Sequence, residues 1–183
     1  MPRVLGVDPG SLSTGWGLIV ERGGAPGLED CGSIRLPAAC GLPDRLARLQ
    51  IELEALVARL APDVAAVETP FHGSSARSAL QLAHARGAIL AVLARAGLPV
   101  AEYTPAQVKK AISGNGRAEK AQVGAMVERL LGLARPGAPH DVADALAVAW
   151  CHLASARFVD AVQRATGPAS PGRAAAGPGR RGR

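Results

Sequence analysis

The feature that most constrains the fold is a short apolar strand that ends in a carboxylate and occurs twice in the chain. Residues 4–7 run directly into Asp8, and residues 64–67 run directly into Glu68. Neither run has a polar face, which is typical of central strands that are covered on both sides. We therefore expect a sheet with helices on both faces, and we expect each acid where a buried strand reaches solvent.

For Asp8 taken alone, two interpretations are open. An isolated carboxylate is costly to bury, so an acid at the end of a buried strand is usually hydrogen-bonded or bound to a cation. Pro9 and Gly10 follow Asp8 directly, however, and Asp-Pro-Gly is also good turn chemistry.

The other elements follow in an order that predicts the architecture. Further strands are expected over residues 14–20, 28–36, 64–68 and 100–103. Helices bounded by proline, glycine or capping residues are expected over about 43–61, 76–96, 104–113, 119–131 and 140–163. One apolar stripe marks the first helix, at Leu42, Leu46, Leu49, Leu53, Leu56 and Leu60. The order predicts an α/β fold with a mixed five-stranded sheet, in which an antiparallel meander of three strands is joined by parallel strands.

Gly15 and Gly17 lie two residues apart on the expected second strand, and hence on one face of it. Glycine weakens a strand and often marks a place where another backbone or a ligand comes close. We expect such an approach on this face.

Composition predicts one domain over residues 1–164. The chain has 183 residues, with 48% hydrophobic but only 3% aromatic residues, so its core must consist mostly of Ala, Val and Leu. Residues 165–183 are rich in Gly, Pro, Ala and Arg and predict a disordered basic tail. That tail holds four arginines of a chain whose net charge is +6, so the body is only mildly basic. Charge alone therefore does not establish a nucleic-acid partner.

Cysteine usage and hydropathy predict the compartment. Cys31, Cys40 and Cys151 are an odd number without CxxC spacing, which argues against a disulfide framework or a zinc site and fits a reducing cytoplasm. No signal peptide is recognisable, and no apolar run approaches the roughly 18 residues of a membrane span. We expect a soluble cytoplasmic protein that does not bind a membrane.

Two further acids, Asp141 and Asp144, begin the last expected helix. They are three residues apart, so they project on the same face. Acids at a helix N-terminus commonly offset the macrodipole, and that interpretation suits Asp141 taken alone. Asp144 stands among apolar neighbours instead. Together with Asp8 and Glu68, they form an oxygen-rich set that suits Mg²⁺ or Mn²⁺.

Three motifs occur in an ordered set, namely residues 5–10 with 14–17, Val67-Glu68 followed by Phe71, and residues 141–147. Each motif alone is weak. Together, from Val4 to about His152, they resemble the RuvC-type Holliday-junction resolvases, which are crossover junction endodeoxyribonucleases of the RNase H-like fold. The resemblance implies symmetric nicking of two opposed strands of a four-way DNA junction by a homodimer, in recombination and repair, with RuvA and RuvB as associates.

Residue by residue, the resemblance implies that Asp8, Glu68, Asp141 and Asp144 are the catalytic and metal-binding acids. Two Mg²⁺ ions, for which Mn²⁺ would substitute, could activate a water and brace the leaving 3′-oxygen. We expect Asp8 to bridge them, Glu68 and Asp144 to hold one or both, and Asp141 to complete the outer sphere of one.

Histidine remains an alternative at one of these positions, because the family has either aspartate or histidine where Asp141 stands. His140 directly precedes Asp141. The spacing to Asp144 favours Asp141 as the ligand and leaves His140 as an assisting base. His72, His84 and His152 show no ligand spacing and are expected at the surface or in packing.

For DNA binding, Lys109 and Lys120 match family positions that contact the DNA near the scissile phosphate, and Phe71 matches an aromatic that stacks on a base. Each has an ordinary alternative, since lysines are commonly solvated helix charges and Phe71 could anchor its loop against the next helix. The Ala/Leu-rich helix from Ser78 to Ala96 is either a dimer face or core. The tail either adds non-specific DNA affinity or has no effect.

Other functions fit part of the pattern. Asp8, Gly10 and Gly15 also resemble the phosphate loop of actin-like phosphotransferases, but these need two lobes and a second glycine-rich motif. A non-catalytic junction-binding module would not need four acids. A nuclease of the same fold that acts on flaps or RNA-containing duplexes is the remaining alternative.

Overall fold

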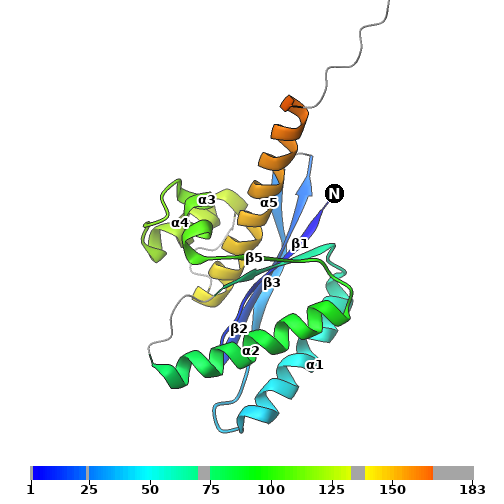
Figure 1. The fold of residues 1–183 in the computed structure, drawn as a ribbon, viewed down its shortest axis with the longest axis vertical. Helices are drawn as coiled ribbons and strands as arrows, with labels where there is room; N and C mark the ends of the chain where they lie inside the picture. The colour runs from blue at the N-terminus through cyan, green and yellow to red at the C-terminus, as the bar shows by residue number, and fades with distance from the viewer. Residues whose placement is uncertain (1, 24, 70–74, 133–138, 167–183) are drawn as a thin grey trace, which may run out of the picture.

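The computed structural model describes residues 2–23, 25–69, 75–132 and 139–166. Five strands form one sheet in the order β3-β2-β1-β4-β5. Their bounds are β1 Arg3–Asp8, β2 Ser13–Arg22, β3 Ala25–Arg35, β4 Val64–Glu68 and β5 Val100–Tyr103. Strands β1, β2 and β3 form an antiparallel meander, and β4 pairs in parallel with β1 and β5. The predicted mixed sheet is therefore confirmed (Figure 1).

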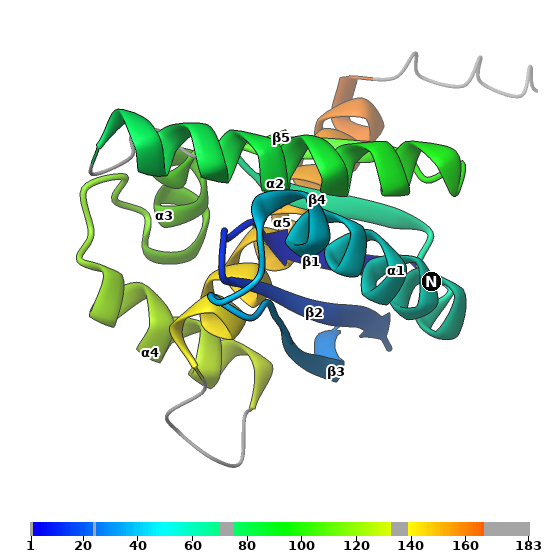
Figure 2. The same ribbon diagram turned by 90° about the horizontal axis from the view of Figure 1, so that it is seen from below.

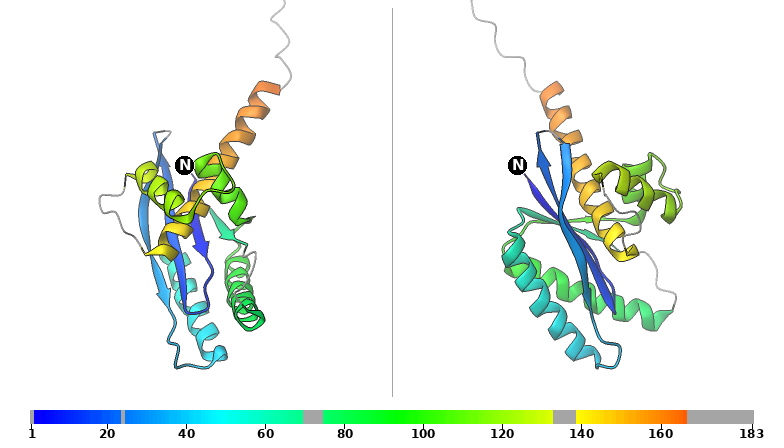
Figure 3. Two further views of the ribbon diagram at one scale, coloured as in Figure 1. Left: turned by 90° about the vertical axis from the view of Figure 1, so that its left-hand side faces the viewer. Right: turned by 180° about the vertical axis from the view of Figure 1, so that it is seen from behind.

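The helices cover both faces of this sheet, as the two apolar strands require. Their bounds are α1 Leu42–Leu60, α2 Ala76–Arg95, α3 Pro105–Ser113, α4 Lys120–Leu131 and α5 His140–Thr166. Figure 2 shows α1 and α2 on one side of the sheet, and Figure 3 shows α5 crossing the other side with α3 and α4 beside it.

Each face has its own apolar core, and alternation along the strands decides which side chain enters which core. Leu5 and Val7 of β1 pack in the core under α1 and α2. Val4 packs in the core under α5, together with Ala66 of β4 and Ile19 of β2. Even-numbered side chains of β1 and β4 therefore face α5, and this periodicity carries Asp8 and Glu68 to the same side.

Helix α1 buries the predicted leucine stripe, with Leu49, Leu53, Leu56 and Leu60 in the core. The structure adds a buried charge that the pattern did not predict. Arg45 lies among these leucines, and its guanidinium donates a 3.2 Å hydrogen bond to the carbonyl of Ser11. Arg45 thereby ties α1 to the turn that follows Asp8.

The C-terminal boundary differs slightly from the prediction. Helix α5 continues to Thr166, two residues into the segment that composition assigned to the tail. Figure 1 shows the last turns of α5 projecting beyond the sheet. Residues 167–183 lie outside the described residues. Within the described part of the chain, none of the helices is both long and apolar enough to span a membrane.

Candidate active site

Three glycines seat the start of α5 directly on the sheet. A Cβ added at Gly15 would lie 2.0 Å from the carbonyl oxygen of Asp141, and one at Gly6 would lie 1.9 Å from that of Ala145. At Gly17 the clash would be with the side chain of Leu146, at 2.3 Å. The close approach predicted at Gly15 and Gly17 is therefore to a helix. This contact brings the first turns of α5 over the ends of β1 and β2.

Asp8 and Glu68 meet at the carboxyl ends of two neighbouring parallel strands. Val7 pairs with Val67, so the next residue on each strand is an acid that faces α5. The two carboxyl groups share a hydrogen bond. Open α/β sheets commonly place their sites at this edge. The predicted meeting of the two strand-end acids is observed.

The electrostatics of this pair are unusual for carboxylates. Burial, with the negative charges of Glu68 and Asp144, raises the pKa of Asp8 to about 8. Burial and the charge of Asp144 also raise the pKa of Glu68. The raised pKa values favour retention of a proton by the metal-free Asp8–Glu68 pair, in which the two carboxyl groups are hydrogen-bonded. Crowded acids with perturbed pKa values in a cleft are characteristic of functional sites.

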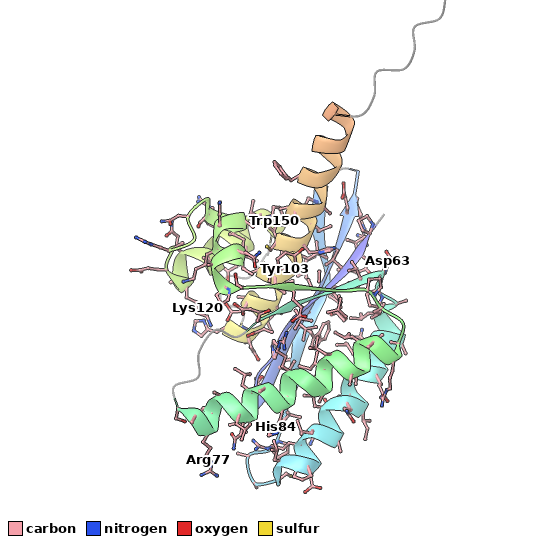
Figure 4. All side chains as sticks on the ribbon, in the orientation of Figure 1. Asp63, Arg77, His84, Tyr103, Lys120 and Trp150 are labelled. Carbon is pink, nitrogen blue, oxygen red and sulfur yellow. The ribbon has the colours of Figure 1, made fainter. Side chains whose placement is uncertain are left out.

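Asp144 joins this pair from α5. It lines a pocket of about 220 Å³ with Glu68, Lys109 and Lys120, and Val108 and Val123 form part of the apolar wall. The ammonium group of Lys120 forms an ion pair with the Oδ2 atom of Asp144. In Figure 4, Lys120 lies beside the N-terminal end of α5. One pocket thus holds acids from β4 and α5 together with lysines from α3 and α4.

Asp141 is close to this cluster along α5, but its carboxylate is turned toward β2. Its Oδ2 atom accepts a hydrogen bond of 2.5 Å from the hydroxyl of Ser13, and its Oδ1 atom accepts one of 3.0 Å from the backbone N–H of Val142. The structure thus brings Asp8, Glu68 and Asp144 together and places Asp141 at their side.

The donor set of the cluster suits a hard divalent cation, because three carboxylates contribute only oxygen atoms. Asp8, Glu68 and Asp144 also act electrostatically on one another, so a cation placed among them would relieve their repulsion. Within residues 2–23, 25–69, 75–132 and 139–166, however, no three His, Cys, Asp or Glu side chains already form a metal cage. The residues fit a metal by the chemistry of their donor atoms.

The histidines have other surroundings. His140 and His84 are exposed, on α5 and α2 respectively, and Figure 4 labels His84. The Nδ1 atom of His152 lies 2.9 Å from the Tyr103 hydroxyl, to which it is hydrogen-bonded. The expectation of surface or packing roles holds for His84 and His152. Phe71 and His72 lie outside the described residues.

Sequence reasoning assigned no role to Ser13 or to the side chain of Thr14. Thr14 is completely buried, and its hydroxyl donates a 3.3 Å hydrogen bond to the carbonyl of Gly10. It closes the turn after Asp8, while Ser13 holds Asp141. Hydroxyl residues just after an Asp-Pro-Gly turn were the available signal, since Ser and Thr side chains often bond to nearby backbone groups.

Comparison with known proteins adds to this geometry. The chain matches the family described as crossover junction endodeoxyribonuclease RuvC over residues 4–152. It is 47% identical to the protein of that name from Chloroflexus aggregans over 154 residues, covering 84% of this chain and 94% of the relative. The relative from Syntrophomonas wolfei is 47% identical over 156 residues, covering 85% and 91%.

A solved structure agrees with these matches. The structure of T. thermophilus RuvC in complex with a Holliday junction substrate is 32% identical, with a TM-score of 0.81 over 87% of this chain and 97% of that chain. Fold and site together define a metal-dependent nuclease with an RNase H-like fold. The chain belongs to the RuvC family of crossover junction endodeoxyribonucleases. This membership decides against an actin-like phosphotransferase and against a non-catalytic binding module.

Proposed function

We propose that this chain resolves four-way DNA junctions by hydrolysing one phosphodiester bond in each of two opposed strands. The observation that carries the proposal is the cluster of Asp8, Glu68 and Asp144, with Lys109 and Lys120 lining the same pocket as Glu68 and Asp144. Acids that bind cations and lysines that bind phosphate are the two groups that such a reaction needs. The T. thermophilus relative, whose structure holds a Holliday junction substrate, supports the choice of substrate.

We assign the metal to the acids of this cluster. Asp8, Glu68 and Asp144 would hold two Mg²⁺ ions, for which Mn²⁺ would substitute, and Asp141 would complete the outer sphere of one. Bound ions of this kind activate the attacking water and stabilise the leaving 3′-oxygen. The chain itself holds the carboxylates at one pocket, of which Val108 and Val123 form part of the apolar wall. A cation held there would favour the ionised forms of these acids.

We assign DNA contacts to Lys109, Lys120 and Phe71. The two lysines line the pocket beside the acids, where a phosphate would enter. Lys109 also acts on Glu68 electrostatically. For Phe71 the support is its place in the motif after Glu68, and its proposed role is to stack on a base at the junction centre.

Symmetric nicking needs two sites in a fixed relation, which a C₂ homodimer supplies. We propose a homodimer and place the exposed face of α2 at its interface. We further propose RuvA and RuvB as partners, a cytoplasmic location, and one nuclease domain followed by a basic tail. Family membership supports the homodimer, the partners and the location, the exposed residues of α2 support the interface, and composition supports the tail.

The test is a nicking assay on a synthetic four-way junction, with and without Mg²⁺. Asp8→Asn should abolish nicking and leave junction binding close to that of the wild type, because the substitution removes a charge and keeps the shape. Asp44→Asn, at an exposed acid in the first turn of α1, is the matched control and should change neither. Loss of binding and nicking together in Asp8→Asn would show that Asp8 is structural.

The same assay tests the substrate class. Junctions, flaps and RNA–DNA hybrids of equal length are compared at one salt concentration, since phosphate contacts make binding salt-dependent. We expect paired nicks in the junction and little cleavage of the other two. Faster cleavage of flaps or hybrids would contradict junction resolution and leave the nuclease assignment intact.

A further inference from the structure

Lys120 occupies an unusual position for a surface lysine. It is the first residue of α4, and its ammonium group forms an ion pair with Asp144. The charges of Asp8 and Glu68 act on it as well. The ion pair with Asp144 thus places one positive charge of the protein itself at the acid cluster.

We propose that Lys120 serves as the counter-cation of the acid cluster when no divalent metal is bound, and that metal entry displaces it. Lys120 would therefore be a positioning residue that competes with the metal for Asp144. The inference rests on the proposed function, because it assumes that the metal binds at these acids.

The arrangement of the acids supports a competition. No preformed metal cage exists among the described residues, although three carboxylates interact closely. The Oδ2 atom of Asp144 is already engaged by Lys120 and must be released before it can bind a metal. An ammonium group supplies hydrogen-bond donors and a single charge, whereas a divalent cation supplies twice the charge and binds the oxygens directly. The metal is therefore the stronger occupant.

The exposure of the two partners shows which of them can leave. The side chain of Lys120 is 62% exposed, and that of Asp144 only 21%. A long side chain anchored at a helix end keeps its charge in water when it swings outward, so release of Lys120 costs little. Asp144 has no such freedom, because its helix is seated on the sheet at Gly6 and Gly15.

Displacement would leave Lys120 at the same pocket. Lys109 already lines this pocket, so the released ammonium group would stand next to a second positive charge. A phosphate group of the DNA would then be attracted to both lysines. Metal binding would thus free Lys120 to bind phosphate, and the two binding events would be coupled through this side chain.

The test measures metal binding without DNA and without turnover. The full-length wild type and Lys120→Gln are titrated with MnCl₂ by calorimetry at pH 7.5. Lys120→Gln should bind Mn²⁺ about three- to tenfold more tightly, because the competing charge is gone. Lys120→Arg retains the charge and should stay within about twofold of the wild type. Lys110→Gln removes an exposed lysine from α3 and is the matched control.

Three outcomes decide the matter. Tighter binding in Lys120→Gln alone supports the displacement. Equal Mn²⁺ affinities in the wild type, Lys120→Gln and Lys110→Gln would overturn the inference and leave the proposed function standing. If Asp144→Asn bound Mn²⁺ as tightly as the wild type, the metal would lie elsewhere, which would overturn the inference and the proposed metal site together.

Discussion

The two sides of the pocket are built by different kinds of contact. On the acid side, α5 rests on β1 and β2 with backbone against backbone, because Gly6 and Gly15 leave no room for a Cβ. On the lysine side, α3 and α4 pack against α5 through apolar side chains such as Val108, Val123 and Val127. Backbone contacts fix position closely, whereas side-chain packing tolerates small shifts.

This difference suits the two tasks of the site. Acids that share cations must keep their spacing, so they belong on the rigid side. Lysines that follow a phosphate must adjust, and Lys120 stands on the exposed first turn of α4. One pocket thus combines a fixed half, which carries the acids, with an adjustable half, which carries the lysines. The predictions below test this division.

The largest expected change in stability comes from a glycine substitution on the acid side, which is compared with a matched glycine substitution on the lysine side. Gly15→Ala places a Cβ 2.0 Å from the carbonyl oxygen of Asp141, so α5 must lift from the sheet. We expect a loss of about 3 kcal/mol in the free energy of unfolding, measured with urea.

The matched substitution is Gly124→Ala in α4. An added Cβ there meets nothing within 4 Å. Removing a glycine from a helix interior should stabilise the protein by up to about 1 kcal/mol. Equal losses at Gly15 and Gly124 would contradict the division into a fixed and an adjustable side.

The sequence predicted the fixed side better than the adjustable one, for physical reasons. Apolar runs that end in Asp8 and Glu68 specify both the strands and the face on which the acids lie, because side chains alternate along a strand. The glycines of β2 likewise indicated a close approach. These features are local in the chain, so a pattern can reveal them.

Other features depend on which side chains meet in space. Ser13 and Asp141 are 128 residues apart, and nothing local to either predicts their hydrogen bond. The ion pair of Lys120 with Asp144 is of the same kind. The periodicity at α5 placed Asp141 and Asp144 on one helix face, yet their carboxylates have different partners. Rotamers and long-range partners cannot be read from spacing alone.

The second-largest expected effect is a pH dependence of the free energy of unfolding, caused by Asp8 on the acid side of the pocket. Folded Asp8 has a pKa of about 8, against 3.8 for the ordinary side chain. Between these values the unfolded chain has lost a proton that the folded chain keeps, so the free energy of unfolding should fall as the pH rises. Each unit of pKa shift corresponds to about 1.4 kcal/mol, and with solvent screening at the pocket we expect a fall of about 2 kcal/mol.

The measurement is urea denaturation in EDTA at pH 5, 6.5 and 8. Asp8→Asn removes the titrating group and should give a flatter profile, with higher stability than the wild type at pH 8. Wild-type stability that increases from pH 5 to pH 8 would show that Asp8 is not held protonated in the metal-free fold.

The smallest effect is expected at Ser13, which joins β2 to the first turn of α5. Ser13→Ala removes the 2.5 Å hydrogen bond to Asp141 and should cost about 1 kcal/mol in the free energy of unfolding. Ser11→Ala is the control, because Ser11 contributes its backbone carbonyl to Arg45. If Ser11→Ala lost as much unfolding free energy as Ser13→Ala, the effect would come from a change in the turn and not from loss of the hydrogen bond to Asp141.

The central claim is that Asp8, Glu68 and Asp144 bind the catalytic cations. Anomalous diffraction from crystals soaked in MnCl₂ tests it most directly, because the signal locates manganese independently of the protein density. The account predicts anomalous peaks within coordination distance of Asp8 and Asp144, with the Lys120 ammonium group moved away from Asp144. Manganese bound only elsewhere, with the ion pair between Lys120 and Asp144 intact, would contradict it.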